Sequence, residues 1–194
     1  MAVCGPVRVS NKANIPRKGG VLLLANHLSD LDPVVVQMAC PRPIYFMAKS
    51  ELFEMGFLSR VICFFRAFPV KRGEPDRDSI KKAVRLIQAG QAVCVFPEGL
   101  ISETGELLEL KSGVALIARM AKCPTIGCRL QNTQLVMPYA QTKPRRSGSN
   151  VFAIWSEALP PQTHGSAEEY MEWVRVQLTP PTIEPPNSPD AKKP

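Results

Sequence analysis

Two of the short runs that are apolar at every position constrain the fold more than any other feature of this chain. The runs are Val21–Ala25 and Ala92–Phe96. A strand with one wet face alternates apolar and polar residues, whereas a strand buried on both faces reads as a continuous apolar run. Such strands occur in parallel sheets that helices cover from both sides. The two runs therefore predict an α/β fold with a parallel sheet at its centre.

Helical and strand patterns alternate through most of the remaining sequence. Ser79–Gln88 has apolar residues at helical spacing, and Ser166–Glu169 forms a capping box ahead of a helix that reaches Leu178. This alternation predicts a single α/β domain with a mostly parallel central sheet flanked by helices. Further strands are predicted over Val7–Asn11, Ile44–Met47, Ala67–Lys71, Thr125–Arg129, Gln134–Pro138 and Val151–Trp155. Further helices are predicted over Pro33–Ala39, Ser112–Lys122 and Ser50–Phe65, the last interrupted near Gly56.

Length and local composition predict the domain organisation. The 194 residues suit one folded domain over residues 1–178, whereas residues 179–194 are rich in proline and poor in apolar side chains, which predicts a disordered tail. No apolar run approaches the roughly 18 residues of a membrane span. The N-terminus lacks the basic and apolar regions of a signal peptide. The cysteines lie mostly in apolar runs, which is typical of reduced, buried thiols in a cytosolic protein.

The chain is basic, with a formal net charge of +7. This charge favours anionic partners such as lipid headgroups, phosphates or an acidic carrier protein. A nucleic-acid partner is not expected, because the basic residues are scattered and the sequence contains no recognisable binding module.

Polar residues follow both buried runs at the point where each predicted strand ends. His27 follows the first run, and the carboxyl ends of parallel strands form the edge of the sheet where ligands bind. A histidine acts as a base near neutral pH, and it does so best when a carboxylate orients its ring. Asp30 and Asp32 are both candidates for that carboxylate, and spacing does not choose between them. Taken by itself, Asp32 just before Pro33 is better explained as a helix N-cap than as a catalytic residue.

Pro97 and then Glu98-Gly99 follow the second buried run. A carboxylate there can accept a hydrogen bond from a substrate hydroxyl, and glycine permits close approach of the backbone, although an ordinary turn explains the same residues. Lys49, Lys71 and Arg72 follow neighbouring predicted strands. Cationic heads at a strand-end crevice suit a phosphomonoester, although such residues commonly form a solvated basic face.

Four motifs in a fixed order make the sequence similar to the glycerolipid acyltransferases, the family typified by 1-acyl-glycerol-3-phosphate acyltransferase (lysophosphatidic acid acyltransferase). The first is the Asn-His-x-x-x-x-Asp pattern of residues 26–32. The second is Phe68–Arg72, the third is the Phe-Pro-Glu-Gly of residues 96–99, and the fourth is Pro124–Ile126. The resemblance extends from about Val7 to Leu159.

The resemblance implies a direct acyl transfer. His27, oriented by Asp32, would take the proton from the free hydroxyl of a 1-acyl-glycerol-3-phosphate acceptor. The alkoxide would then attack the thioester of acyl-CoA or acyl carrier protein and give phosphatidic acid. The resemblance implies no bound cofactor and no metal. It also implies an enzyme of phospholipid biosynthesis attached peripherally to the cytoplasmic face of the membrane.

The resemblance also implies an acceptor site. Lys49 and Arg72 would hold the acceptor phosphate, and Glu98 and Gly99 would contact its glycerol part. This sequence departs from the family where Thr-Arg usually follows Phe-Pro-Glu-Gly, because Leu100-Ile101 stands there. The departure leaves glycerol-3-phosphate or another lyso-lipid as alternative acceptors, and a catalytically weak lipid-binding relative as an alternative function.

One long apolar segment can be interpreted in two ways. Leu52–Phe68 is rich in Phe, Leu, Ile and Met, with Arg60 and Arg66 among them. Such a segment can line an acyl-chain groove or lie in the membrane interface. It is equally well explained as a helix packed on the sheet.

Overall fold

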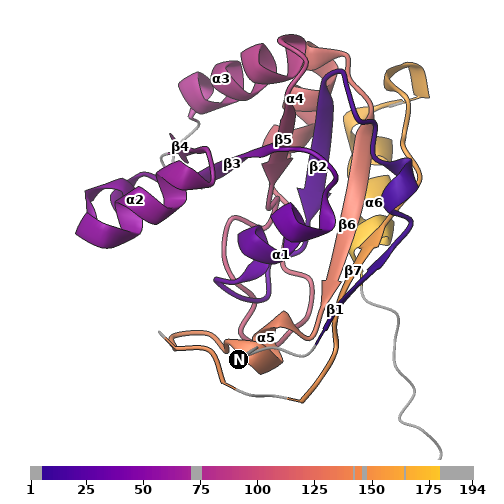
Figure 1. The fold of residues 1–194 in the computed structure, drawn as a ribbon. Coiled ribbons are helices and arrows are strands. Elements are labelled where there is room, and N and C mark those ends of the chain that lie inside the picture. The colour runs from indigo at the N-terminus through magenta and orange to yellow at the C-terminus, as the bar shows by residue number, and fades with distance from the viewer. Residues whose placement is uncertain (1–5, 71–75, 142, 146–147, 164, 180–194) are drawn as a thin grey trace, which may run out of the picture.

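A seven-stranded sheet forms the centre of the protein, in the order β1-β7-β6-β2-β5-β3-β4 (Figure 1). The structure is a computed structural model that describes residues 6–70, 76–141, 143–145, 148–163 and 165–179. The strands are β1 (Val7–Ser10), β2 (Val21–Ala25), β3 (Ile44–Lys49), β4 (Ala67–Val70), β5 (Ala92–Val95), β6 (Thr125–Gln131) and β7 (Val151–Trp155).

The sheet is mostly parallel, which confirms the predicted fold class. The pairs β2–β5, β2–β6, β3–β5, β3–β4 and β1–β7 are parallel, and β6–β7 is antiparallel. Both predicted double-buried runs lie in the middle of the sheet as neighbours. β2 has β5 on one side and β6 on the other, and each of its five residues is 0% exposed.

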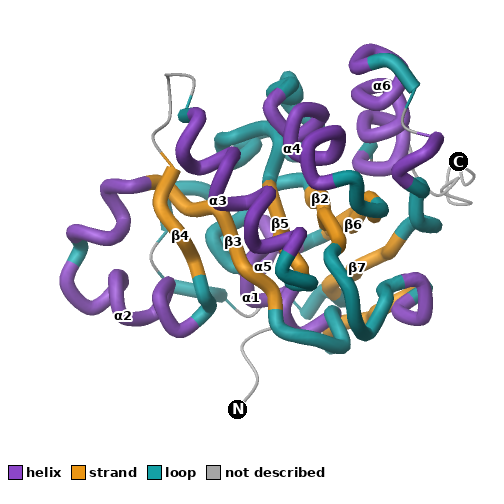
Figure 2. Tube along the Cα trace, turned by 90° about the horizontal axis from the view of Figure 1, so that it is seen from above, coloured by secondary structure: helices purple, strands orange, loops and turns teal. Residues whose placement is uncertain are grey.

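Helices cover both faces of the sheet (Figure 2). They are α1 (Asp32–Ala39), α2 (Gly56–Phe64), α3 (Arg77–Gln88), α4 (Gly113–Ala121), α5 (Thr133–Val136) and α6 (Ala167–Leu178). Short 3-10 turns occupy Lys12–Asn14, Ser50–Glu54 and Pro161–Thr163.

Alternate residues of β2 divide the core in two. One core contains Val21, Leu23 and Ala25 together with side chains of α1 and α5. The other contains Leu22 and Leu24 together with side chains of α3, α4 and α6. This division follows from the period of two in a strand, which sends successive side chains to opposite faces. A continuous apolar strand thus joins both cores and fixes the edge at which it ends.

The helix α2 is the exception to this layering. It packs mainly against the 3-10 turn Ser50–Glu54 and against β4, and it projects from the β4 edge of the sheet (Figure 1). Its apolar side chains are therefore only partly covered: Phe64 is 82% exposed and the preceding Met55 is 55% exposed.

One predicted strand is wrong. Gln134–Pro138 does not pair with the sheet; Thr133–Val136 forms the short helix α5 instead. Asn132 follows β6 with a φ of 67°, which lies in the left-handed region. The backbone therefore turns away from the extended conformation of the strand at this residue. Val136 is then fully buried in the core on the α1 side of the sheet. A short apolar run satisfies either a strand or a buried turn of helix, so periodicity alone could not separate them.

The other predicted elements are confirmed, with ends shifted by a few residues. Ser166 and Glu169 form the expected capping box at the start of α6. Residues 180–194, most of the predicted tail, lie outside the described residues, as does Lys71 at the end of a predicted strand. Within the described part of the chain, no helix is long and apolar enough to span a bilayer.

Candidate active site

Three neighbouring strands deliver polar side chains to one edge of the sheet. β2 leads into His27, β5 leads into Glu98, and β3 ends in Lys49. Because β2, β5 and β3 are adjacent and parallel, their carboxyl ends lie side by side in that order. The structure therefore brings His27, Glu98 and Lys49 to the edge that the sequence indicated.

His27 and Asp32 form a buried pair at this edge. The His27 Nδ1 lies 2.8 Å from Asp32 Oδ2, and the two residues are 8% and 0% exposed. A carboxylate at this distance holds the proton on Nδ1, so Nε2 is left as the basic nitrogen. Nε2 makes no hydrogen bond with any residue the structure describes. The arrangement is that of an oriented general base.

The choice between Asp30 and Asp32 is settled by the path of the loop. Asp30 is exposed, whereas Asp32 turns back over its own loop and accepts hydrogen bonds from the Leu28 and Ser29 N–H groups at 2.6 and 2.8 Å. Asp32 does not cap α1, because it is the first residue of that helix and its carboxylate binds the loop before it. Its second oxygen, Oδ1, is buried and has no partner among the described residues.

Glu98 ties the loop after β5 to the loop after β2. It is 2% exposed, and its Oε1 accepts the His27 backbone N–H at 2.7 Å while Oε2 accepts the Leu108 N–H at 2.8 Å. Burial raises the pKa of the Glu98 carboxyl, and the two backbone hydrogen bonds partly oppose that shift. The Glu98 carboxylate thus fixes the backbone of His27 through the His27 N–H group.

Glu98→Gln is expected to lower the free energy of unfolding by about 1 to 3 kcal/mol, because the amide can accept only one of the two backbone N–H groups. Since the folded-state pKa of Glu98 is raised, its contribution to stability is greatest below its unfolded pKa and declines as the pH rises through the folded value. The gap in unfolding free energy between wild type and variant should therefore narrow from about pH 4 to pH 7. Urea titrations at several pH values measure this gap, and a gap that widens over that range would contradict the prediction.

Three contacts at the site were not found by sequence reasoning. Phe96 stacks on the His27 ring with centroids 4.2 Å apart and planes at 22°. The Ser102 N–H donates to the His27 carbonyl at 2.8 Å. Asn26 donates to and accepts from the backbone of Leu130, at 3.0 and 2.7 Å, so its side chain extends the β2–β6 ladder. The adjacency of the two buried runs was the one available signal, since it places residues 26–27 beside residue 96.

Of the remaining predicted binding residues, Lys49 lies farther from His27 along the same edge. Lys49 is on β3, two strands from β2 or about 10 Å, and it pairs with Glu51 at 3.1 Å with both side chains exposed. Arg72 lies outside the described residues. Gly99 has a φ of +70°, and a Cβ there would meet nothing within 4 Å, so its backbone conformation, not packing, requires glycine.

The two residues that depart from the family pattern differ in exposure. Leu100 is 59% exposed and Ile101 is half-buried. They follow Glu98 directly and precede Ser102, so they lie on the segment that is hydrogen-bonded to His27. An apolar pair therefore stands at this edge where the family pattern has Thr-Arg.

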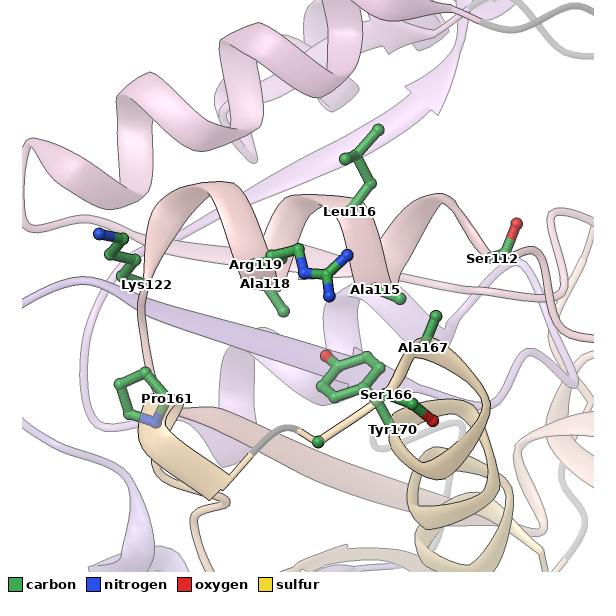
Figure 3. A pocket seen from close by; sticks show the side chains of 11 residues that line it. Ser112, Ala115, Leu116, Ala118, Arg119, Lys122, Pro161, Ser166, Ala167 and Tyr170 are labelled. Carbon is green, nitrogen blue, oxygen red and sulfur yellow. The ribbon is translucent and has the colours of Figure 1, made fainter.

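A cavity in the described part of the molecule lies away from this edge. It has a volume of about 840 Å³ and lies between α4 and the start of α6 (Figure 3). Ser112, Arg119, Lys122 and Tyr170 are among its lining residues. Across the described residues, no group of three or more His, Cys, Asp or Glu side chains is placed to hold a metal ion.

Comparison with known proteins agrees with the geometry. The family model described as "Acyltransferase" matches residues 6–131, which cover β1 through β6 and every residue discussed at the edge of the sheet. The chain belongs to the acyltransferase family. This family match confirms the resemblance that the ordered motifs predicted.

Individual relatives carry a more specific name. The chain is 33% identical over 132 residues to the 1-acyl-sn-glycerol-3-phosphate acyltransferase of Bacillus subtilis, over 68% of this chain and 65% of that protein. It is 32% identical over 128 residues to a probable enzyme of the same name from Mycoplasma pneumoniae, over 62% of this chain and 47% of that protein. The chain thus spans about half to two thirds of the length of these relatives.

A solved structure shares the fold. The crystal structure of the 1-acyl-sn-glycerophosphate acyltransferase PlsC from Thermotoga maritima superposes with a TM-score of 0.73 at 23% sequence identity. The match covers 88% of this chain and 68% of that one. At this identity the likeness shows a shared fold over the matched part of the chain.

Proposed function

We propose that this protein transfers a fatty acyl group from an acyl thioester to the free hydroxyl of 1-acyl-glycerol-3-phosphate, giving phosphatidic acid. The hydroxyl oxygen forms a bond with the thioester carbonyl carbon, and the carbon–sulfur bond breaks. The hydroxyl proton passes to His27 Nε2 and from there to the leaving thiolate. Atoms and charge balance, because the products are an ester and a neutral thiol.

The oriented His27 ring is the observation that carries this proposal. Asp32 Oδ2 fixes the proton on Nδ1, Phe96 restricts rotation of the ring by stacking, and Glu98 holds the backbone N–H behind it. A base held from three directions loses little further entropy on reaching the transition state. The test is transfer of a labelled acyl group from acyl-CoA or acyl carrier protein to 1-acyl-glycerol-3-phosphate in vesicles. The proposal fails if wild type acylates that acceptor from neither donor.

We assign Glu98 a positioning role in this reaction. Each of its oxygens already accepts a backbone N–H, so a substrate hydroxyl would have to share an occupied acceptor. The acceptor phosphate is assigned to Lys49, at the end of β3, and to Arg72, which lies outside the described residues. Gly99 offers an open surface for the glycerol part, since nothing lies within 4 Å of its missing Cβ.

A different acceptor is the second candidate, and Leu100-Ile101 favours it. An apolar pair on the segment bonded to His27 offers no charge to a phosphate, so it suits an acceptor whose phosphate lies elsewhere or is masked by a headgroup. A panel of 1-acyl-glycerol-3-phosphate, glycerol-3-phosphate and other lyso-phospholipids, assayed at equal surface concentration, separates the two candidates. If a lyso-phospholipid with a headgroup is acylated faster than 1-acyl-glycerol-3-phosphate, the second candidate acceptor is correct and the first is wrong.

We also propose that the protein attaches peripherally to the membrane and that α2 makes the contact. The exposed Phe64 and Met55 supply apolar side chains, and the exposed Arg60 and Arg66 supply charges for anionic headgroups. A helix with this composition suits the headgroup boundary of a bilayer. The alternative of a helix packed on the sheet is disfavoured by how far α2 projects (Figure 1).

Phe64→Asp is expected to weaken binding to vesicles containing anionic phospholipid by about 10-fold or more, because burying a phenylalanine side chain contributes roughly 1.5 to 3 kcal/mol. Val176 on α6 is 58% exposed, so Val176→Asp is a matched control with the same change in charge. Sedimentation with vesicles measures both. An equal loss of vesicle binding in the two variants would show that α2 is not the part of the protein that contacts the membrane.

A further inference from the structure

The outer surface of α4 carries two adjacent apolar side chains. Leu116 and Met120 are 46% and 43% exposed. They lie four residues apart, so they share one face of the helix and form a continuous apolar strip. Single apolar residues on a surface are ordinary, but an apolar strip with a charged rim is how protein interfaces are built.

Cations border this strip on the side of α3. The helices α3 and α4 lie side by side (Figure 2), and Gln88 Nε2 of α3 donates to the Met120 carbonyl at 3.5 Å. Lys81 and Arg85 lie seven and three residues before Gln88, so they share its stripe and face the same side of α3. Both are exposed. They therefore flank the apolar strip along one edge.

Cations also border the strip on the side of α6. Arg119 and Lys122 are exposed and line the cavity of about 840 Å³ between α4 and α6. Figure 3 shows the Arg119 side chain at this cavity, which Tyr170 and Ala167 also line. The strip and the cavity form one continuous surface, since Leu116 belongs to both. We call this surface, made of Lys81, Arg85, Leu116, Arg119, Met120 and Lys122, the α4 face.

The positive charge of the α4 face is largely uncompensated. None of its cations forms an ion pair with a residue in the described part of the chain. Glu168, at the start of α6, is an acidic neighbour of Arg119. The first N–H groups of α6 are engaged by the Ser166–Glu169 capping box, so the helix terminus adds little. The face therefore selects a partner that is itself acidic.

We propose that the α4 face is the docking surface for an acidic helix of the protein that carries the acyl thioester. An amphipathic acidic helix matches both features, because its apolar side fits the strip and its carboxylates meet cations on both edges. A small anionic donor such as acyl-CoA would use the cations and leave the strip uncovered. This inference rests on the proposed acyl transfer and names its donor.

The α4 face is also well placed for delivery of a thioester. The Lys111 N–H, just before α4, donates to the Pro97 carbonyl at 2.8 Å, and Pro97 precedes the Glu98 that holds His27. The nine residues of α4 extend about 14 Å from that point. A carrier bound along α4 can therefore extend its flexible prosthetic arm past the start of the helix to the catalytic edge.

The test is binding of a bacterial acyl carrier protein, labelled on its phosphopantetheine thiol, to the full chain by fluorescence anisotropy. Arg119→Glu with Lys122→Glu should weaken binding by about 10-fold or more at low salt. Arg17→Glu with Lys18→Glu makes the same change in net charge on exposed residues before β2 and is the matched control. The control should change affinity less than about threefold, through long-range steering only.

A second variant tests the apolar strip without changing charge. Leu116→Ser with Met120→Ser should also weaken carrier binding, whereas CoA added as a competitor should displace the carrier poorly. Equal affinities of the two charge-reversal variants, or no binding by wild type, would overturn the docking surface. Vesicle binding lost in the Arg119/Lys122 variant while carrier binding is kept would overturn it too, and would assign the face to lipid.

Transfer from acyl-CoA by the same variants separates this inference from the proposed function. If docking is right, Arg119→Glu with Lys122→Glu lowers transfer from the carrier and leaves transfer from acyl-CoA within about twofold of wild type. If wild type binds the carrier but transfers from neither donor, the proposed function fails and the docking surface stands.

Discussion

Replacing His27 with alanine is expected to lower the rate of acyl transfer roughly 10²- to 10⁴-fold, the range that a general base contributes. The ring is held by Asp32 Oδ2 at Nδ1 and stacked on Phe96, which leaves Nε2 as the one ring nitrogen able to take the hydroxyl proton. An aliphatic hydroxyl is a weak nucleophile until it loses that proton. Initial rates with both thioester donors, at saturating acceptor in vesicles, measure the loss.

His27→Gln distinguishes a lost base from a damaged fold. Alanine removes the stacking contact with Phe96 and leaves Asp32 with only its backbone donors, so some loss of stability accompanies it. Glutamine fills more of the space and can still donate to Asp32, but it cannot accept a proton. Both variants should be inactive while retaining the far-ultraviolet circular dichroism of wild type. A glutamine variant within 10-fold of the wild-type rate would exclude His27 as the base.

The sequence predicted the fold well where burial alone decides it. β2 and β5 are apolar on both faces because each packs against helices on both sides, and the periodicity of residues 79–88 reports the single buried face of α3. The carboxyl edge then follows from strand direction, which is why His27 and Glu98 were placed together before any contact was known. These inferences depend on local patterns of apolar residues, because buried positions require apolar side chains at the spacing of a helix or a strand.

The path of the loops could not be predicted in the same way. Asp32 was separated from Asp30 only by a turn that carries its carboxylate back to the Leu28 and Ser29 N–H groups. Glu98 is an interior bridge only because residues 98–110 fold back and present the Leu108 N–H to it. Such contacts depend on backbone geometry between distant residues, and hydrophobic periodicity carries no information about it.

The same limit explains the weaker assignments. The short helix α5 has the same apolar pattern as a strand, and it forms after the left-handed turn at Asn132, with Val136 buried in the core. Lys49 was placed correctly at the edge, but its pairing with Glu51 depends on the exposed 3-10 turn that follows β3. Ion pairs between exposed side chains contribute little free energy, so the sequence pattern does not predict which partner an exposed charged residue takes.

Asp32→Asn is expected to lower the rate about 10²-fold or more while the loop keeps its shape. Asparagine has the size of aspartate, and its carbonyl oxygen can take the place of Oδ2, which accepts from the Leu28 and Ser29 N–H groups and faces His27 Nδ1. The amide nitrogen then occupies the place of Oδ1, which has no partner among the described residues. The substitution therefore removes the negative charge with little change in geometry.

The loss should fall on kcat and leave the KM for the acceptor nearly unchanged, because the charge acts on the proton transfer and not on binding. Asp30→Asn is the matched control: the same substitution two residues away, on an exposed side chain, should leave both constants within about twofold of wild type. Urea unfolding of both variants reports the cost of burying the new amide, about 1 to 3 kcal/mol at residue 32. If Asp32→Asn raised KM and left kcat intact, the carboxylate would be a binding group. If it lowered stability alone, the carboxylate would serve only to shape the loop, and His27 would have to act without a partner that stabilises its protonated form.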